Sequence, residues 1–287
     1  MHGIINIYKP CGMSSNYVLT ILKKSLNIKK LGHLGTLDPL ACGVLPVMVN
    51  KGTKLFDFYL NKSKVYRAIF TFGIETDTLD SEGKIINKNN NIPNETQINE
   101  TIKKFIGKIN QIPPIFSAKK INGQTAYNLA RNGENIELKP KEVEIFDFKL
   151  IKQINKNSFL FEIKCSSGTY IRSIARDLAK ALNTCAFMSA LIRLESGEFN
   201  IFSATYVKEL TKENFNDKII ELGNLLIDRE KLDLNSSYYK ALSNGVKIDI
   251  DHKNKDNLVI FCNNELIGLG NIVDKKLTIK TNLQIKN

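Results

Sequence analysis

The sequence has no tryptophan, only three histidines and no apolar stretch of 18 residues, which argues against a membrane-spanning helix. Its five cysteines form no Cys-x-x-Cys pair, and no histidine stands at a metal-ligand spacing from them. A zinc site and a disulfide framework are therefore disfavoured, and free thiols fit a reducing cytoplasm. No basic leader precedes an apolar run at the N-terminus. We expect a soluble cytoplasmic protein that uses no metal, no cofactor and no membrane.

Acidic residues are scarce at the start of the chain. The first 72 residues contain ten lysines and arginines but only two acids, Asp38 and Asp57. This segment therefore carries +8 of the formal net charge of +12 of the 287-residue chain. A basic region of this kind favours binding to a polyanion such as nucleic acid. Because the whole chain is rich in Lys, Asn and Ile, the clustering of the charge is more informative than its total.

Asp38 stands alone in a glycine-bearing loop at residues 32–46, GHLGTLDPLACGVLP. Pro39 disfavours a helical backbone at Asp38, and Gly35 and Gly43 permit conformations and close approaches that a side chain would block. A single carboxylate on a shaped loop within a basic region predicts nucleophilic chemistry on an anionic polymer. An isolated Asp-Pro pair more often only starts a turn, so this interpretation depends on the longer pattern.

Hydrophobic periodicity predicts strands mixed with helices, which is typical of an α+β protein. Strands are expected where β-branched and aromatic residues recur, at 3–8, 44–49, 64–72, 143–151 and 159–165. Helices are expected from Ser14 or Ser15 to about Leu26, at 95–106 before Gly107, and along the stripe of Ile171, Ile174, Leu178 and Leu182. The Asn-rich segment 86–94 is expected to be a loop.

The sequence pattern changes after about Leu232. Short β-prone pieces follow at 246–250, 258–262, 266–272 and 277–279. Their number and size fit a small β domain that is separate from the preceding part.

Residues 32–46 closely resemble the catalytic loop of the TruB family, bacterial pseudouridine synthases that act on a uridine in the T-loop of tRNA. Five more blocks resemble the same family in the same order: 9–15 (KPCGMSS), 64–68 (KVYRA), 76–80 (TDTLD), 111–119 (QIPPIFSAK) and 167–172 (SGTYIR). Several blocks in the right order are far more specific than any one of them.

The resemblance implies a fold and a partner. A catalytic domain at 1–232 would be built on a mixed, largely antiparallel sheet with flanking helices. A PUA-like RNA-binding domain would follow at 233–287, supported by the segments 241–245 (ALSNG) and 266–270 (LIGLG). The implied partner is the T-arm stem-loop of tRNA, and we expect the protein to act as a monomer.

The resemblance also implies the roles of five residues. Asp38 is the nucleophile, and Arg172 pairs with its carboxylate, which offsets burial and fixes orientation. Tyr66 and Tyr170 contact the target uracil by stacking or through the phenol, and Tyr66 is expected to take part in catalysis. Leu191 lines the pocket, although on its own it cannot be told from a core residue.

Three further substrate contacts follow from the resemblance. His33 is expected to lie against the flipped nucleotide, Lys9 to contact a phosphate, and Asp80 to contact the substrate. Simpler interpretations are a loop histidine bonded to backbone and a solvated lysine. The sequence departs from the family pattern at Cys42, where threonine is usual, and at Ser167, a position that is often basic.

Two other functions stay open. A non-catalytic RNA-binding or tRNA-folding protein on the same scaffold is disfavoured by the joint presence of Asp38, Tyr66, Tyr170 and Arg172. A hydrolase with an Asp nucleophile, such as a nucleosidase, is disfavoured because no second carboxylate is partnered to Asp38 in the sequence. We therefore expect an enzyme that flips a T-loop uridine of tRNA and isomerises it to pseudouridine.

Overall fold

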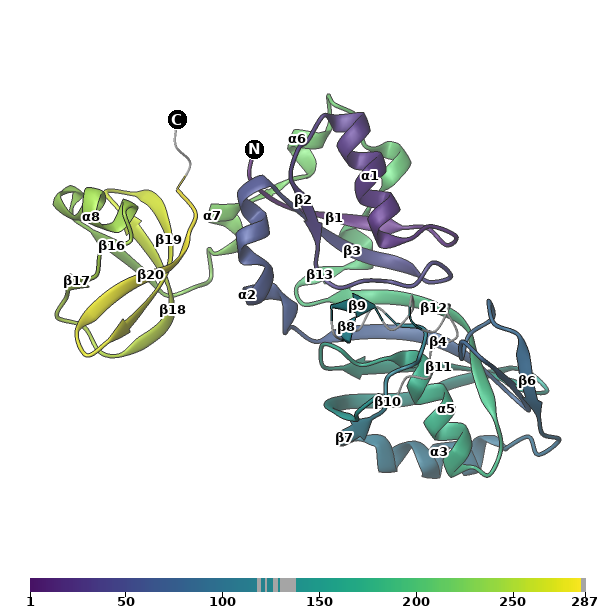
Figure 1. The fold of residues 1–287 in the computed structure, drawn as a ribbon. Coiled ribbons are helices and arrows are strands. Elements are labelled where there is room, and N and C mark those ends of the chain that lie inside the picture. The colour runs from purple at the N-terminus through teal and green to yellow at the C-terminus, as the bar shows by residue number, and fades with distance from the viewer. Residues whose placement is uncertain (118–119, 122, 126–128, 130–137, 285–287) are drawn as a thin grey trace.

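The computed structural model describes residues 1–117, 120–121, 123–125, 129 and 138–284. Ala118 and Lys119, which end the QIPPIFSAK block, lie outside this part of the chain. Two large sheets organise the described residues: an 11-stranded main sheet and a five-stranded C-terminal sheet (Figure 1). None of the helices in the described ranges has the length and apolarity that a bilayer crossing requires.

The main sheet follows the order β14-β1-β3-β12-β4-β11-β10-β7, with β2, β13 and β15 attached at its sides. Its strands are β1 (Gly3–Lys9), β2 (Leu31–His33), β3 (Cys42–Val49), β4 (Lys64–Phe72), β7 (Gly107–Gln111), β10 (Lys141–Asn155), β11 (Ser158–Cys165), β12 (Ala186–Ser196), β13 (Phe199–Asn200), β14 (Thr205–Tyr206) and β15 (Ile220–Glu221). Among the described strands of this sheet, only β1–β14 and β3–β12 pair in parallel. The predicted mixed and largely antiparallel sheet is therefore confirmed.

The remaining elements lie around the two sheets. The helices are α1 (Ser15–Leu26), α2 (Phe56–Leu60), α3 (Glu95–Ile102), α5 (Ile171–Ala181), α6 (Phe215–Lys218), α7 (Leu222–Leu225) and α8 (Tyr239–Ser243). Two hairpins are formed by β5 (Ile74–Thr76) with β6 (Ile85–Lys88) and by β8 (Lys120–Ile121) with β9 (Gln124–Thr125). The C-terminal sheet contains β16 (Lys231–Leu234), β17 (Ile248–Asp249), β18 (Lys255–Cys262), β19 (Glu265–Val273) and β20 (Lys276–Asn282).

The strands and helices predicted before residue 182 are confirmed in position, with one exception. Ser14 caps α1 by accepting a hydrogen bond from the Tyr17 N–H, as its side chain predicted. The segment 86–94, predicted as a loop, instead begins inside β6, which pairs with β5. All four residues of β6 are exposed, Ile85 and Ile86 included, so hairpin pairing rather than burial holds this strand.

Strand β12 was not predicted, yet it joins the two halves of the main sheet. It pairs in parallel with β3, where Arg193 faces Gly43, and antiparallel with β4, where Arg193 faces Tyr66. Gly43 has φ +103°, and a Cβ there would lie 2.3 Å from the Arg193 carbonyl oxygen. The close approach expected of Gly43 is therefore confirmed, and it sets the start of β3, which follows the loop of Asp38, against β12.

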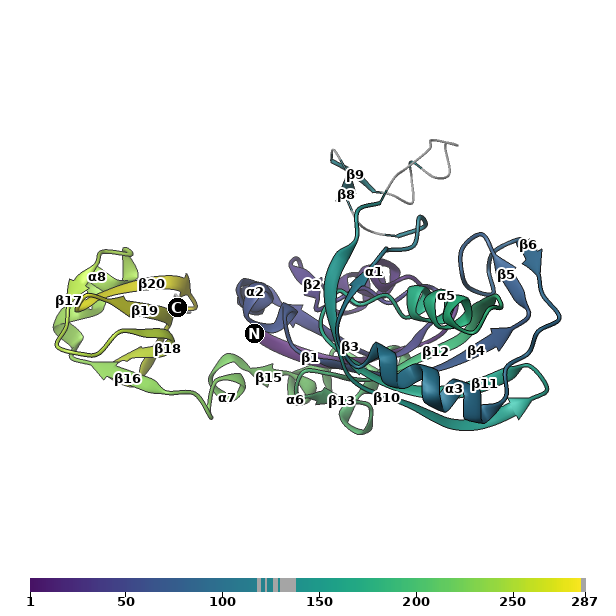
Figure 2. The same cartoon turned by 90° about the horizontal axis from the view of Figure 1, so that it is seen from below.

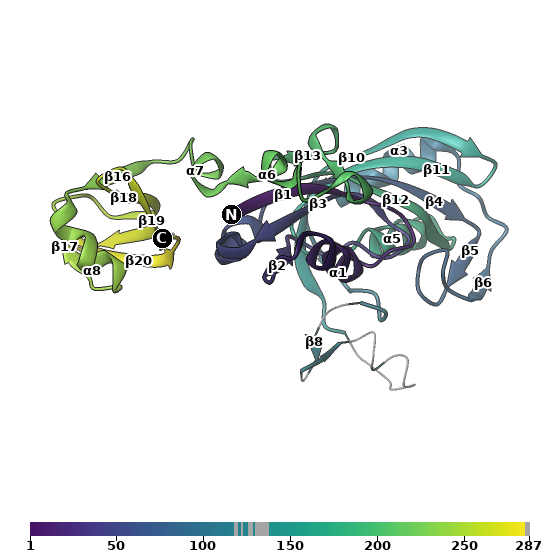
Figure 3. The same cartoon turned by 90° about the horizontal axis from the view of Figure 1, so that it is seen from above.

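Helices cover the main sheet according to the alternation of its strands. Ile5 and Ile7 of β1 pack in one cluster with Val18 and Leu22 of α1, whereas Ile4 packs in another cluster that contains residues of α7. Successive side chains of a strand point to opposite faces, so α1 and α7 lie on opposite sides. Figures 2 and 3 show α5 on the same side as α1, with the β8–β9 hairpin projecting beyond them.

The C-terminal sheet is curled and lies to one side of the main sheet, near α2 and α7 (Figure 1). Val259, Leu269 and Leu283 share a buried cluster with Leu55 and Tyr59. The Lys54 ammonium also donates to the Asn282 carbonyl at 2.7 Å. The sheet therefore contacts the segment that leads into α2, and its form is consistent with the predicted PUA-like β domain.

Candidate active site

A cavity of about 430 Å³ opens on the side of the main sheet that carries α5. It lies where the Asp38 loop, β4, β12 and the start of α5 meet. Six of the predicted site residues line it: His33, Asp38, Tyr66, Tyr170, Arg172 and Leu191. The structure therefore brings together residues that are up to 158 positions apart in the sequence, from His33 to Leu191. A volume of this size fits a base or nucleoside-sized group.

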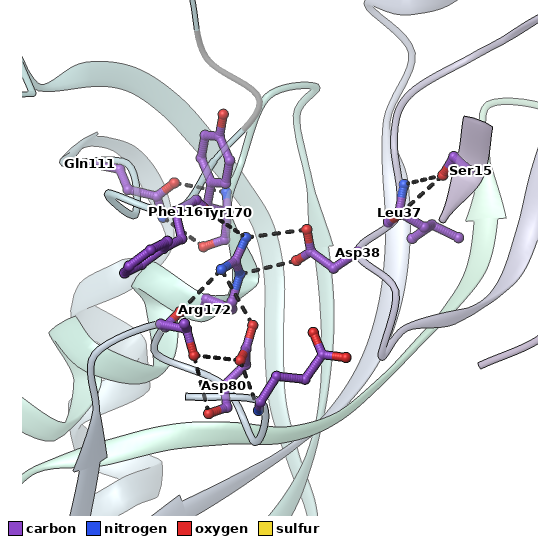
Figure 4. A network of polar contacts seen from close by, with 10 residues as sticks. Ser15, Leu37, Asp38, Asp80, Gln111, Phe116, Tyr170 and Arg172 are labelled. Atoms are coloured by element: carbon purple, nitrogen blue, oxygen red, sulfur yellow. Dashed lines mark hydrogen bonds and ion pairs between the residues drawn. The ribbon is translucent and has the colours of Figure 1, made fainter. Parts of the chain in front are cut away.

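Asp38 and Arg172 form a two-point ion pair at the edge of this cavity (Figure 4). Arg172 Nε lies 3.0 Å from Asp38 Oδ2, and Arg172 Nη2 donates to Asp38 Oδ1 at 3.1 Å. The arginine side chain is 6% exposed, whereas that of Asp38 is 34% exposed. The guanidinium is thus fixed in the protein, and the carboxylate it orients still faces open space.

The carboxyl of Asp38 has opposing influences on its pKa. Burial raises the pKa above its ordinary value, the Arg172 guanidinium opposes that rise, and the Asp80 carboxylate adds to it. The net direction is upward, so the ionised form carries a desolvation cost. An anion held in this way is less solvated than a surface carboxylate, and this favours its use as a nucleophile.

Arg172 is itself held by three acceptors other than Asp38. Its Nη1 lies 3.3 Å from Asp80 Oδ2 and donates to the Thr78 carbonyl at 3.0 Å, and its Nη2 donates to the Phe116 carbonyl at 3.0 Å. Asp80 is 3% exposed and does not line the cavity. In this structure Asp80 is a buried partner of Arg172, and the substrate contact at Asp80 stays a prediction.

Lys9 is also held inside the protein. It is fully buried, and its ammonium donates to the carbonyls of Pro10, Met13 and Pro39. All three N–H donors of the Lys9 ammonium are engaged inside the protein in this structure, and the phosphate contact at Lys9 stays a prediction. Lys9 instead ties the end of β1 to Pro39, the residue next to Asp38.

Further hydrogen bonds hold the backbone on both sides of Asp38, at Leu37 and at Pro39. Ser15 Oγ donates to the Leu37 carbonyl at 3.0 Å and accepts from the Leu37 N–H at 2.9 Å (Figure 4). The Gly12 N–H donates to the Pro39 carbonyl at 2.8 Å. Residues 9–15 (KPCGMSS) therefore hold the backbone of the Asp38 loop through hydrogen bonds. This gives a physical reason why this block accompanies residues 32–39 (GHLGTLDP).

The two tyrosines come from different elements. Tyr66 lies on β4 and is 7% exposed, and burial raises the pKa of its phenol. Tyr170 is the residue that precedes α5, where it has an extended backbone, and burial raises its phenol pKa as well. Both phenols stay protonated near neutral pH and present aromatic surface to a ligand. Leu191 on β12 is buried and lines the same cavity, as predicted.

His33 ends β2 and borders the cavity. Burial lowers the pKa of its imidazole, and the nearby Arg193 guanidinium lowers it further. The ring is therefore neutral near neutral pH. Its Nδ1 is buried without a hydrogen-bond partner among the described residues, so the simpler interpretation of a loop histidine bonded to backbone through that atom does not hold.

Two residues of the site were missed in the sequence, Arg193 and Gln111. Arg193 borders the cavity, as does Lys64, whose pKa burial lowers to about 8. Gln111 is buried behind Tyr170. The signal for Arg193 was its spacing from Leu191, since residues two apart on a strand share a face. No comparable sequence pattern indicates the role of Gln111, because its side chain bonds the backbone of Tyr170, which is distant in the sequence.

Comparison with known proteins was made at the level of family, sequence and structure. Residues 23–171 match the TruB family pseudouridylate synthase (N terminal domain). tRNA pseudouridine synthase B of Clostridium novyi (strain NT) is 40% identical over 98% of this chain and 99% of the relative. The protein of the same name from Alkaliphilus oremlandii (strain OhILAs) is 41% identical over 86% of this chain and 83% of the relative.

Solved structures give a matching result. The crystal structure of a Cbf5-Nop10-Gar1 complex contains a chain with a TM-score of 0.69 and 26% identity, covering 94% of this chain and 78% of that one. A chain of the archaeal box H/ACA sRNP Nop10-Cbf5 complex has a TM-score of 0.70 and 22% identity, covering 98% and 86%; this second likeness is one of fold. The family match, the near-full-length relatives and the shared fold agree that this chain belongs to the TruB family of pseudouridylate synthases.

Proposed function

We propose that Asp38 is the nucleophile with which this enzyme converts a uridine in the T-arm of tRNA to pseudouridine. The enzyme is a tRNA pseudouridine synthase, in line with its family and with relatives named tRNA pseudouridine synthase B. Our proposal adds the nucleophile, the T-arm as the recognised element, action as a monomer and a cytoplasmic location.

The observation that carries the proposal is the geometry of Asp38. Both of its oxygens are held by Arg172, yet its side chain is one third exposed toward the cavity. The reaction breaks the bond between ribose C1′ and uracil N1, turns the base and rejoins C1′ to C5, with the C5 proton lost and N1 protonated. A fixed carboxylate can attack or stabilise the electron-deficient ribose while the base turns, and it needs no redox step.

The cavity suits a base that has left its stack. Extruding a nucleotide costs a few kcal/mol, which contacts in the pocket must offset. Tyr66 and Tyr170 offer aromatic surface to the cavity, and base–aromatic stacking contributes about 1–3 kcal/mol per base. His33, with its neutral ring at the cavity border, is placed to fill space next to the flipped nucleotide.

RNA affinity would come from two regions. The exposed Lys29 and Lys30 precede β2, which ends at His33 beside the cavity. The C-terminal sheet, which begins with β16 at Lys231 and makes up most of the proposed 233–287 domain, would contact RNA backbone away from the chemistry. We keep 1–232 as the proposed catalytic part. Contacts of both kinds add affinity through phosphate neutralisation and weaken with salt.

Release of tritium from 5-tritiated uridine in tRNA tests the function. An isomerase releases the C5 hydrogen and leaves the RNA chain intact, with pseudouridine in the digest. A nucleosidase would release uracil and leave an abasic site, and a purely RNA-binding protein would do neither. A T-arm stem-loop and an anticodon stem-loop of equal length, assayed side by side, separate T-arm recognition from general RNA activity.

A further inference from the structure

Arg193 is a fully buried cation in the cavity wall. It is 1% exposed, and its Nε and Nη2 donate to the Val44 and Gly35 carbonyls at 2.7 and 3.0 Å. No ion pair joins it to a carboxylate among the described residues. A buried guanidinium without a counter-ion is costly, so its position requires a reason beyond packing.

The register of the main sheet points to that reason. Arg193 on β12 is the direct antiparallel partner of Tyr66 on β4. Side chains of such a pair leave the same face with their Cβ atoms about 4.5–5.5 Å apart, and both residues line the cavity. The Arg193 guanidinium also lowers the pKa of the Tyr66 phenol, against the effect of burial. The cation therefore acts on the phenol oxygen.

Hydrogen-bond chemistry then determines where the phenol proton points. A guanidinium has donors only, and a phenol has one donor and an acceptor oxygen. When Arg193 donates to the phenol oxygen, the Tyr66 O–H must be directed elsewhere. Tyr66 and Arg193 both border the cavity, which is the open space beside the phenol.

We propose that Arg193 is a positioning residue that acts through Tyr66, so that the Tyr66 O–H donates to a carbonyl oxygen of the flipped uracil. This rests on the proposed function and deepens it. When the bond from C1′ to N1 breaks, negative charge spreads onto the uracil oxygens. A phenol polarised by a buried cation stabilises that charge more than it stabilises the neutral base, which is where a contact accelerates the reaction. In this proposal Arg193 donates to the phenol oxygen in the complex with substrate, once water is excluded.

A double-mutant cycle tests the proposal with single-turnover tritium release at saturating RNA, using Arg193→Gln, Tyr66→Phe and the double variant of the full chain. Arg193→Gln is expected to lower the rate by about 10-fold or more in the wild-type background, and by much less once the phenol oxygen is gone. Coupling greater than about threefold supports the proposal; equal losses in both backgrounds, within about threefold, overturn it. Arg193→Lys, which keeps the charge, should recover part of the rate.

Arg67→Gln is the matched control. Arg67 neighbours Tyr66 on β4, points to the other face and pairs with Glu162 at 2.9 Å, with its side chain 48% exposed. Its removal should change the rate by less than about twofold. Thermal unfolding reports whether each variant folds. If Arg193→Gln does not fold, Arg193→Lys replaces it in the cycle, with a smaller expected loss, because a lysine keeps the charge but not the planar fork of the guanidinium.

A second readout needs no turnover and decides the matter if Tyr66→Phe is too slow to measure. Tyrosines are replaced by 3-fluorotyrosine, and the ¹⁹F signal that disappears in Tyr66→Phe is assigned to position 66. Arg193→Gln should move its titration to higher pH by about one unit or more, and an unchanged titration overturns the proposal. A wild-type enzyme that releases no tritium from tRNA would instead overturn the proposed function, whatever the ¹⁹F result.

Discussion

The side-chain amide of Gln111 holds the backbone of Tyr170 at both of its polar groups (Figure 4). The Tyr170 N–H donates to Gln111 Oε1 at 2.8 Å, and Gln111 Nε2 donates to the Tyr170 carbonyl at 3.1 Å. Gln111 ends β7, at the far edge of the main sheet, and is 1% exposed. The edge strand therefore fixes the residue that leads into α5 and, two positions later, Arg172.

Gln111→Ala should lower both stability and rate. Removing the amide leaves the Tyr170 N–H without its partner, at a cost of about 1–3 kcal/mol, whereas the Tyr170 carbonyl still accepts from the Ile174 N–H at 3.2 Å. The released Tyr170 segment should cost turnover rather than RNA affinity. Thermal unfolding and single-turnover rates measure the two effects. Gln153→Ala, at an exposed position on β10, is the control and should shift stability by less than about 0.5 kcal/mol. Equal effects in the two variants would contradict this role.

Arg172→Lys should lower the single-turnover rate by about 100-fold or more, because a misplaced reacting group can cost that much. A lysine presents one point charge and cannot replace the fork that holds Asp38, Asp80 and two carbonyls. The control is Arg67→Lys, on the exposed face of β4. A near-normal rate in Arg172→Lys would mean that charge alone, without orientation, is enough for Asp38.

The rate should fall in acid at a pH above the ordinary Asp pKa. The nucleophile must be ionised, and the pKa of Asp38 in the protein is raised, chiefly by burial. Protonation therefore removes the nucleophile as pH falls through that raised value, while the rate is flat above it. Single-turnover rates at saturating RNA give the profile, with RNA affinity measured at each pH. A rate that stays constant down to the ordinary Asp value of 3.8 would contradict the assignment.

Lys29→Gln and Lys30→Gln should weaken RNA binding and make it less sensitive to salt. Both lysines are exposed just before β2. Removing one phosphate contact should reduce the slope of log K against log salt by roughly 0.7–0.9. Lys156→Gln, at the exposed β10–β11 turn beside Phe72 and away from the cavity, should leave the slope unchanged. Equal slopes for all three variants would show that Lys29 and Lys30 do not contact RNA phosphates.

Local patterns predicted nine of the described strands but missed others, among them β7 and β12. The sequence of β12, AFMSALIRLES, contains register shifts between Met188 and Ala190 and between Arg193 and Glu195. Each extra residue resets the alternation of buried and exposed side chains, so no regular period of two is visible. Strand β4, with its strict alternation, was predicted correctly. The parallel pairing of β12 with β3 joins segments that are far apart in the sequence, so no local pattern can indicate it.

The site residues likewise divide into those whose roles were predicted from the sequence and those whose roles depend on long-range contacts. Asp38, Tyr66, Tyr170, Arg172, His33 and Leu191 were predicted from motifs, and the structure gathers all six around one cavity. Lys9 was predicted to contact a phosphate and Asp80 to contact the substrate because both stand in blocks that resemble the family, and solvated charges are the usual case. Burial overrode that rule: each found internal partners that satisfy its charge. Motifs thus identified which residues matter, whereas contacts distinguished those that face the ligand from those that support them.

Asp38→Asn provides the most direct measurement of the central claim. Single-turnover tritium release is followed on a T-arm stem-loop that carries 5-tritiated uridine, with RNA affinity measured in parallel and Asp38→Ala as a second variant. The amide keeps the shape of the carboxylate but is not a competent nucleophile, so release should fall to background while affinity stays within a few-fold of wild type. A rate within about tenfold of wild type in either variant would show that Asp38 is not the nucleophile.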